Sequence, residues 1–79
     1  MKAIVEVMAK ALVEDPENIT INEKEDDRGL LVELRVPEHD MGRVIGKQGR
    51  TAKAMRSIVK AAGMRTGQHV WIDIDVLEK

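Results

Sequence analysis

The residues best suited to chemistry form a short turn bounded by glycines, Gly46-Lys47-Gln48-Gly49, inside a positively charged segment. Between positions 43 and 65 the chain has seven basic residues and no acidic one: Arg43, Lys47, Arg50, Lys53, Arg56, Lys60 and Arg65. Glycine reaches backbone conformations that other residues enter at a cost, so the two glycines predict a tight turn. A helix that starts directly after such a turn exposes unpaired N–H groups and the positive end of its dipole, which attract an anion.

This basic segment belongs to a chain that is slightly acidic as a whole, with a formal net charge of −1. Residues 1–40 contain five basic and eleven acidic side chains, a net charge of −6. Residues 41–79 contain eight basic and three acidic side chains, a net charge of +5. Such a separation indicates one surface built for polyanions and another that avoids them.

The composition limits the classes of protein to consider. We expect the 79 residues to form one small domain, 1–79, with an aliphatic core, because the single aromatic residue among Phe, Trp and Tyr is a tryptophan. The absence of cysteine excludes disulfides and thiolate metal sites, and no cofactor is expected. The start of the chain has neither the apolar run of a signal peptide nor a membrane span, so we expect a cytoplasmic protein.

Other sites that the sequence suggests are weaker. A Walker A phosphate loop does not fit, since three residues separate Gly42 from Gly46 instead of four, and Gln48 replaces the metal-binding Ser or Thr. His39 and His69 lack partners at metal-ligand spacing. Asp73 and Asp75 share one face of a strand, but such a pair is more typical of a solvated edge than of a catalytic pair. With no nucleophile and base in view, we interpret the chain as a non-enzyme.

Hydrophobic periodicity predicts the elements of the N-terminal half. Near the N-terminus apolar residues recur at helical spacing, so we expect a helix that buries this stripe: Ile4, Val7, Met8, Ala11 and Leu12. Asp15-Pro16 should end it. Apolar and polar residues then alternate around 19–22 and 30–36, which predicts two strands. The turn between them, Glu25–Gly29, makes an antiparallel hairpin.

Two helices and a third strand should follow. Asp40 is placed to cap a short helix over 41–45, which Gly46 ends. The next helix, 50–62, should separate its basic residues Arg50, Lys53, Arg56 and Lys60 from an apolar face with Met55, Ile58, Val59 and Ala62. Gly63 and Gly67 bracket a loop before a final strand over 70–76. A helical crossover joins parallel strands, so the predicted fold is α+β, ordered α-β-β-α-α-β, with a three-stranded mixed sheet and the helices on one face.

These residues carry a resemblance to a known family. The run Val44-Ile45-Gly46-Lys47-Gln48-Gly49-Arg50, preceded by Gly42-Arg43 and followed by Thr51, is similar to the G-x-x-G signature of KH domains, whose loop clamps the backbone of four single-stranded nucleotides. The order of elements resembles the type II KH fold. Because the likeness covers essentially the whole chain, it is closest to the small bacterial single-KH-domain RNA-binding proteins.

The resemblance implies a binding site for single-stranded RNA. The turn Gly46–Gly49 would approach a phosphate that Lys47 neutralises, while Arg43, Arg50 and Lys53 extend the positive track. Gly42 would leave room for a base. Ile45 and Ala52 would form part of an apolar floor, and the strand near Leu34 to Val36 would form the opposite wall. Gln48 should point to solvent with Lys47. Residues 41–65 lack an aromatic ring for stacking, so we expect modest affinity and loose sequence preference.

Trp71 is not explained by this fold. Its outward parity matches that of Leu31, so the two side chains form an exposed apolar patch if their strands are neighbours, or else Trp71 lies under the 63–68 loop or beside the sheet edge. Proteins of the resembled family self-associate and pair with a larger RNA-binding protein of the Jag type.

Two functions therefore stay open: a sequence-tolerant RNA binder acting as an RNA chaperone or post-transcriptional regulator, and a protein-interaction module on a KH scaffold. Trp71 shielded by a partner is a hypothesis.

Overall fold

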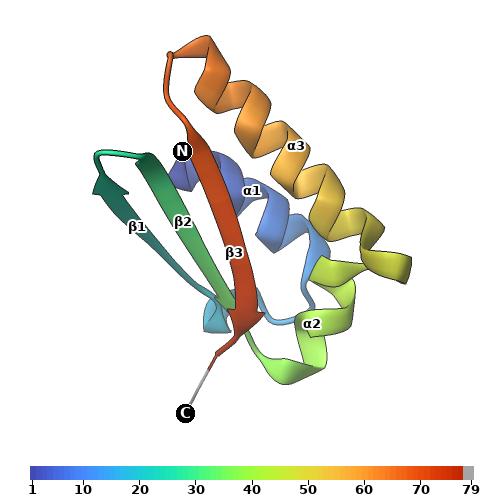
Figure 1. The fold of residues 1–79 in the computed structure, drawn as a ribbon. Helices are drawn as coiled ribbons and strands as arrows, with labels where there is room; N and C mark the ends of the chain where they lie inside the picture. Colours follow the sequence, from blue (N-terminus) through green and yellow to red (C-terminus); the bar gives the residue numbers. More distant parts are fainter. Residues whose placement is uncertain (78–79) are drawn as a thin grey trace.

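The computed structural model describes residues 1–77 as three α-helices packed on one face of a three-stranded sheet (Figure 1). The elements follow the chain as α1 (Lys2–Leu12), β1 (Thr20–Asp26), β2 (Gly29–Val36), α2 (Glu38–Ile45), α3 (Arg50–Arg65) and β3 (Val70–Val76). The predicted α+β class, the element order and the mixed sheet are confirmed. Within the described chain no helix combines the length and apolar character that crossing a bilayer requires.

The sheet has the strand order β1-β2-β3. β1 and β2 form the predicted antiparallel hairpin, in which Asp26 lies opposite Gly29. β3 runs parallel to β2 as the crossover predicts, and Leu31 of β2 is in register with Trp71 of β3. Leu31 and Trp71 are therefore neighbours, as their shared parity suggested.

The core lies between the sheet and the helices. The inward residues of β2, among them Val32 and Leu34, are fully buried, and Val5, Val44 and Val59 reach them from α1, α2 and α3. All these side chains are aliphatic, as the composition predicts. Burial of a side chain of this size contributes about 1.5–3 kcal/mol, which is the main force that holds the helices on the sheet.

The buried stripe of α1 differs from the predicted one. Val5 and Ala9 are fully buried, whereas Ile4 is 38% exposed and Val7 is 70% exposed. Neighbouring positions of an α-helix point about 100° apart. The side of α1 that contacts the core is therefore rotated by about that angle from the side on which Ile4 lies. Ile58 of α3 is likewise 49% exposed instead of buried. Apolar side chains therefore remain on the outer surface of the helical layer.

Asp40 does not cap α2. The helix begins at Glu38, after Pro37, and Asp40 lies in its first turn with no exposed surface. Its carboxylate accepts hydrogen bonds from the backbone N–H groups of Glu14 at 2.9 Å and Asp15 at 3.1 Å. The predicted cap was wrong because the Asp40 carboxylate accepts hydrogen bonds from the segment that follows α1. These residues are far from Asp40 in sequence.

The prediction of a loop from Gly63 was also wrong. α3 continues through Gly63 to Arg65, and the loop starts at Thr66. Gly63 is buried against β3, where an added Cβ would lie 2.6 Å from the carbonyl oxygen of Gln68 and from Cγ2 of Val70. The glycine therefore permits close contact between helix and strand.

Candidate nucleic-acid interface

The glycine turn connects α2 to α3 through a sharply bent backbone. The predicted end of the short helix at Ile45 is confirmed, and Gly46 follows it with φ 77° and ψ 176°. Gln48 and Gly49 both adopt positive φ, at 57° and 74°. The Gly46 N–H donates to the carbonyl of Gly42 at 2.9 Å, and the Gly49 N–H donates to the carbonyl of Gly46 at 3.2 Å. These bonds fix the turn at the start of α3.

The two glycines of the turn are needed for different reasons. A Cβ on Gly46 would collide with the side chain of Thr51 and would lie 2.9 Å from its backbone nitrogen. A Cβ on Gly49 would meet no atom within 4 Å, so only the positive φ favours glycine there. Gly46 therefore brings the turn close to the first residues of α3, and Gly49 leaves open space beside it.

The side chains of the turn face solvent, as the sequence predicts. Lys47 and Gln48 are both exposed, and the Arg50 guanidinium contacts the Gln48 amide oxygen at 3.4 Å. No side chain of residues 1–77 caps the N-terminus of α3. The Arg50 N–H donates to the carbonyl of Lys47, and the positive end of the helix dipole lies at the turn, where it attracts an anion. The turn thus brings a lysine, an arginine and a helix N-terminus to one exposed place.

One face of α3 carries the predicted cationic arc. Arg50, Lys53, Arg56 and Lys60 are all exposed, while Met55 and Val59 on the opposite face are buried. Within the described residues these four cations, together with Lys47 and Arg65, form no ion pair; the pairs that do form involve other side chains. Because these positive charges lie along one helix face and are not paired with acids, they attract a phosphate backbone.

Arg43 differs from the other basic residues of this segment. Its guanidinium pairs with Glu14 at 2.7 Å and with Asp40 at 3.2 Å. Two carboxylates therefore compensate its charge, and the side chain links α2 to the end of α1. The structure places Arg43 beside the turn without leaving its charge free, which sets it apart from Lys47, Arg50 and Lys53.

Asp40 holds this junction together as a charged group. Burial alone would raise the pKa of the Asp40 carboxyl, but the two N–H groups of Glu14 and Asp15 and the charges of His39 and Arg43 lower it below its ordinary value. The His39 Nε2 lies 3.4 Å from the carboxylate. The resulting anion fixes the start of α2, the helix whose other end leads into the turn.

The predicted apolar groove is only partly where the sequence placed it. Gly42 is exposed with open space beside it, Ile45 is half-buried, and Ala52 is 2% exposed. Leu34 and Val36 of the predicted wall on β2 are fully buried, so their side chains offer no exposed surface, and this wall stays a prediction. The edge strand β3 also packs against both α2 and α3.

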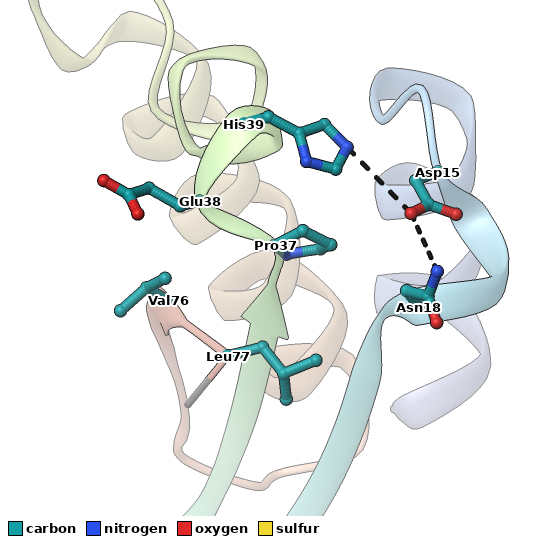
Figure 2. Close-up of a pocket in the computed structure, with 7 residues that line it drawn as sticks. All are labelled: Asp15, Asn18, Pro37, Glu38, His39, Val76 and Leu77. Carbon is teal, nitrogen blue, oxygen red and sulfur yellow. Dashed lines mark hydrogen bonds and ion pairs between the residues drawn. The ribbon is translucent and has the colours of Figure 1, made fainter. Parts of the chain in front are cut away.

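A larger cavity of about 880 Å³ lies elsewhere, at the ends of β2 and β3 (Figure 2). It is lined by Asp15, Asn18, Pro37, Glu38, His39, Val76 and Leu77. The Asn18 amide donates to the Asp15 carboxylate at 2.8 Å, and His39 points toward the same carboxylate at 4.0 Å (Figure 2). The acids Asp15 and Glu38 repel a polyanion, so this cavity does not extend the cationic surface. No local sequence signal predicts it, since its lining comes from distant segments.

Comparison with known proteins gives one family. The sequence profile described as KhpA/KhpB, KH domain matches residues 2–74. A protein of Halalkalibacterium halodurans named RNA-binding protein KhpA is 50% identical over 74 residues, which cover 94% of this chain and 97% of the relative. Proteins of the same name from Clostridium perfringens and Aquifex aeolicus are 47% and 42% identical, and each alignment covers 94% of this chain and 99% or 94% of the relative.

The fold also occurs within a larger solved structure. A crystal structure of Aquifex aeolicus Era bound to GDP and AlF4⁻ superposes with a TM-score of 0.60 and 23% sequence identity. The match covers 99% of this chain but 31% of Era. At this level of identity the comparison shows a shared fold and says nothing about activity.

Proposed function

Since the chain belongs to the KhpA/KhpB family of KH domains, we propose that it binds single-stranded RNA through the turn Gly46–Gly49 and the cationic face of α3. The relatives described above bear the name RNA-binding protein, and the family is not one of enzymes. The observation that carries the proposal is the row of exposed cations without ion pairs within residues 1–77, which starts at Lys47 and continues along α3.

Binding begins with the phosphates. Lys47 and the positive end of the α3 dipole hold one phosphate at the turn, and Arg50 and Lys53 hold those that follow. Such contacts fix the position of the strand without reading its sequence. The open side of Gly42 receives a base, and the half-buried Ile45 supplies an apolar surface next to it. Ala52 contributes little exposed area before binding, because it is 2% exposed.

The site favours unpaired strands over duplexes. A base reaches the surface around Gly42 and Ile45 only when it is splayed out of a stack. Residues 41–65 have no aromatic side chain for base stacking, so sequence preference within this part of the site is loose. A protein of this kind acts as an RNA chaperone or post-transcriptional regulator in the cytoplasm. Nothing in the site detects the 2′-hydroxyl, so single-stranded DNA is the comparison ligand.

Charge reversal at the turn tests the proposal. Lys47→Asp combined with Gln48→Asp places two negative charges where a phosphate should sit, and both side chains are exposed, so the fold should persist. We expect single-stranded RNA binding to be lost in filter-binding or fluorescence-anisotropy titrations at 100 mM salt. The matched control is Lys24→Asp combined with Asn22→Asp on β1, which makes the same change of charge at exposed positions far along the chain.

Circular dichroism establishes that both double variants remain folded. The proposal predicts that the β1 variant retains most of its RNA affinity, with a small loss from the change in net charge. RNA binding by the turn variant that equals that of the β1 variant, with the same salt dependence, would remove the turn from the site.

A second candidate function is protein interaction, which the exposed apolar side chains of the helical layer favour. Ile4 and Val7 of α1 and Ile58 of α3 are 38%, 70% and 49% exposed. On this proposal the layer contacts a second copy of the chain, forming a homodimer, or a larger KH protein of the Jag type. Val7→Asp should abolish self-association in sedimentation experiments while the folded monomer still binds RNA. An unchanged sedimentation coefficient across micromolar concentrations would exclude self-association through this surface.

A further inference from the structure

A separate cavity of about 290 Å³ opens between the cationic face of α3 and the edge strand β3. Its lining residues are Arg56, Lys60, His69, Val70, Trp71 and Ile72. Trp71 is the single Phe, Trp or Tyr residue of the chain and is 41% exposed. Its ring packs edge-on against His69, with ring centroids 4.2 Å apart and planes inclined by 68°. The cavity therefore joins two cations of α3 to the edge strand β3, where Trp71 is one of the lining residues and its partly exposed side chain has the outward parity of Leu31.

The charges at this cavity are not compensated within the protein. Arg56 and Lys60 are exposed and form no ion pair with any of residues 1–77. The acid that follows Trp71 on the same face of β3, Asp73, pairs instead with Arg35 of β2 at 3.0 Å. An anionic ligand at this place meets two free cations and an acid that is already paired.

The cavity lies at the far end of the cationic arc that begins at the glycine turn. Arg56 and Lys60 are six and ten residues beyond Arg50, which corresponds to about 9 and 15 Å along the helix at 1.5 Å per residue. Figure 1 shows the same course, with α3 running from the turn along β3 toward the start of that strand. An RNA strand held at the glycine turn can follow Arg50 and Lys53 to this cavity.

We propose that the cavity is a second nucleotide subsite, in which a base stacks on Trp71 and the adjoining phosphates contact Arg56 and Lys60. The inference rests on the proposed RNA function and extends the site beyond the turn. A volume of about 290 Å³ lies at the lower end of the roughly 300 to 1,000 Å³ of small-molecule pockets, which is enough room for one base. Aromatic stacking accepts every base, so the subsite adds affinity without adding sequence preference.

Trp71 itself reports on the subsite, because it is the single tryptophan and the chain contains no tyrosine. The experiment titrates the protein with oligouridines of four, six and nine nucleotides and follows both anisotropy and tryptophan emission. The proposal predicts that the shortest oligomer binds at the turn with little change in emission. Longer oligomers should quench Trp71 and bind roughly 5- to 150-fold more tightly, the range expected for stacking one base.

Two sets of variants locate the effect. Arg56→Ala combined with Lys60→Ala changes exposed side chains and should remove the gain in affinity of nine nucleotides over four. Trp71→Leu should do the same, and Arg65→Ala, at an exposed position outside the cavity lining, serves as the control. If Trp71→Leu fails to fold, the Arg56 and Lys60 variant and the emission of the native protein still decide the question.

The outcomes separate this inference from the proposed function. Loss of all binding in the Lys47→Asp and Gln48→Asp variant, together with unquenched Trp71 and no dependence of affinity on length, would overturn the subsite and leave the turn in place. Quenching of Trp71 by the four-nucleotide oligomer that equals the quenching by nine nucleotides would also overturn the subsite, since a four-nucleotide oligomer bound at the turn should not extend to it. Emission that changes with protein concentration and not with RNA would assign Trp71 to a protein contact instead.

Discussion

Among single residues, Gly46 and Gly49 share a positive φ but differ in their surroundings. A Cβ at Gly46 would collide with Thr51, whereas a Cβ at Gly49 enters open space. We expect Gly49→Ala to lower the free energy of unfolding by about 1–2 kcal/mol, the cost of the left-handed conformation. Gly46→Ala should lower it further, because the helix start must also move. Urea denaturation measures both, and equal losses would contradict the assigned contact with Thr51.

The residues of the turn could be predicted from sequence because their roles are local. Two glycines three positions apart interrupt the helix whatever the rest of the fold. Lys47 and Gln48, which lie between them, are exposed. Arg43 was not predictable in the same way. Its charge is taken up by Glu14, which is 29 residues away, and no local pattern indicates that pairing.

At the scale of the elements, Asp40 joins α2 to the end of α1, and its stabilising effect depends on pH. Its pKa is lower in the folded protein than the ordinary value of 3.8, so its contribution is complete above that value and is lost as pH falls through the folded pKa. We expect Asp40→Asn to be less stable than the native protein at pH 7. Below pH 3.8 the difference in unfolding free energy should shrink. Urea titrations at pH 7, 5 and 3.5 measure it, and a constant difference would contradict an ionised Asp40.

Two glycines inside helices make a matched pair. Gly42 of α2 has nothing within 4 Å of an added Cβ, so Gly42→Ala should raise the free energy of unfolding by up to about 1 kcal/mol through helix propensity. The same methyl group occupies the proposed room for a base, so RNA affinity should fall. Gly63→Ala should instead lower stability by about 1–3 kcal/mol, because Gln68 and Val70 crowd the site.

Thermal unfolding and RNA anisotropy on both variants separate these effects. A Gly42→Ala protein that is more stable and binds RNA normally would show that no base approaches α2. A Gly63→Ala protein as stable as the native one would show that α3 and β3 are not in the close contact described here.

Element type and order were predictable from periodicity, but the face that each helix buries was less so. In α1 the pattern of apolar residues admits two overlapping stripes, and only the position of the sheet selects Val5 and Ala9 over Ile4 and Val7. The predicted wall of the groove meets the same limit. Parity places Leu34 and Val36 on the inner face of β2, but the helices packed on that face decide whether it is open, and both side chains are fully buried.

Across the whole molecule, the charges divide into an acidic half before residue 41 and a basic half after it. The division persists in space along α3, whose exposed face carries no acid. For single-stranded nucleic acid, each phosphate contact changes the slope of log affinity against log salt by about 0.7. Lys53→Ala should therefore reduce the slope by roughly that amount.

The control for this experiment is Lys24→Ala on β1, where Lys24 is exposed but pairs with Glu33 at 3.4 Å. Its slope should equal that of the native protein, because β1 lies outside the proposed RNA path. Titrations between 50 and 300 mM salt measure both slopes. Equal changes in the two variants would indicate a diffuse attraction and no ordered track along α3.

The central claim is that an unpaired RNA strand contacts the glycine turn and the cationic face of α3. Amide chemical-shift mapping by NMR tests it most directly, with ¹⁵N-labelled protein and a nine-nucleotide oligouridine. The account predicts the largest shifts at Gly46 to Gly49 and in the first turns of α3, and little change in β1. Shifts concentrated on α1 or on the β1–β2 hairpin, with the turn unmoved, would contradict it.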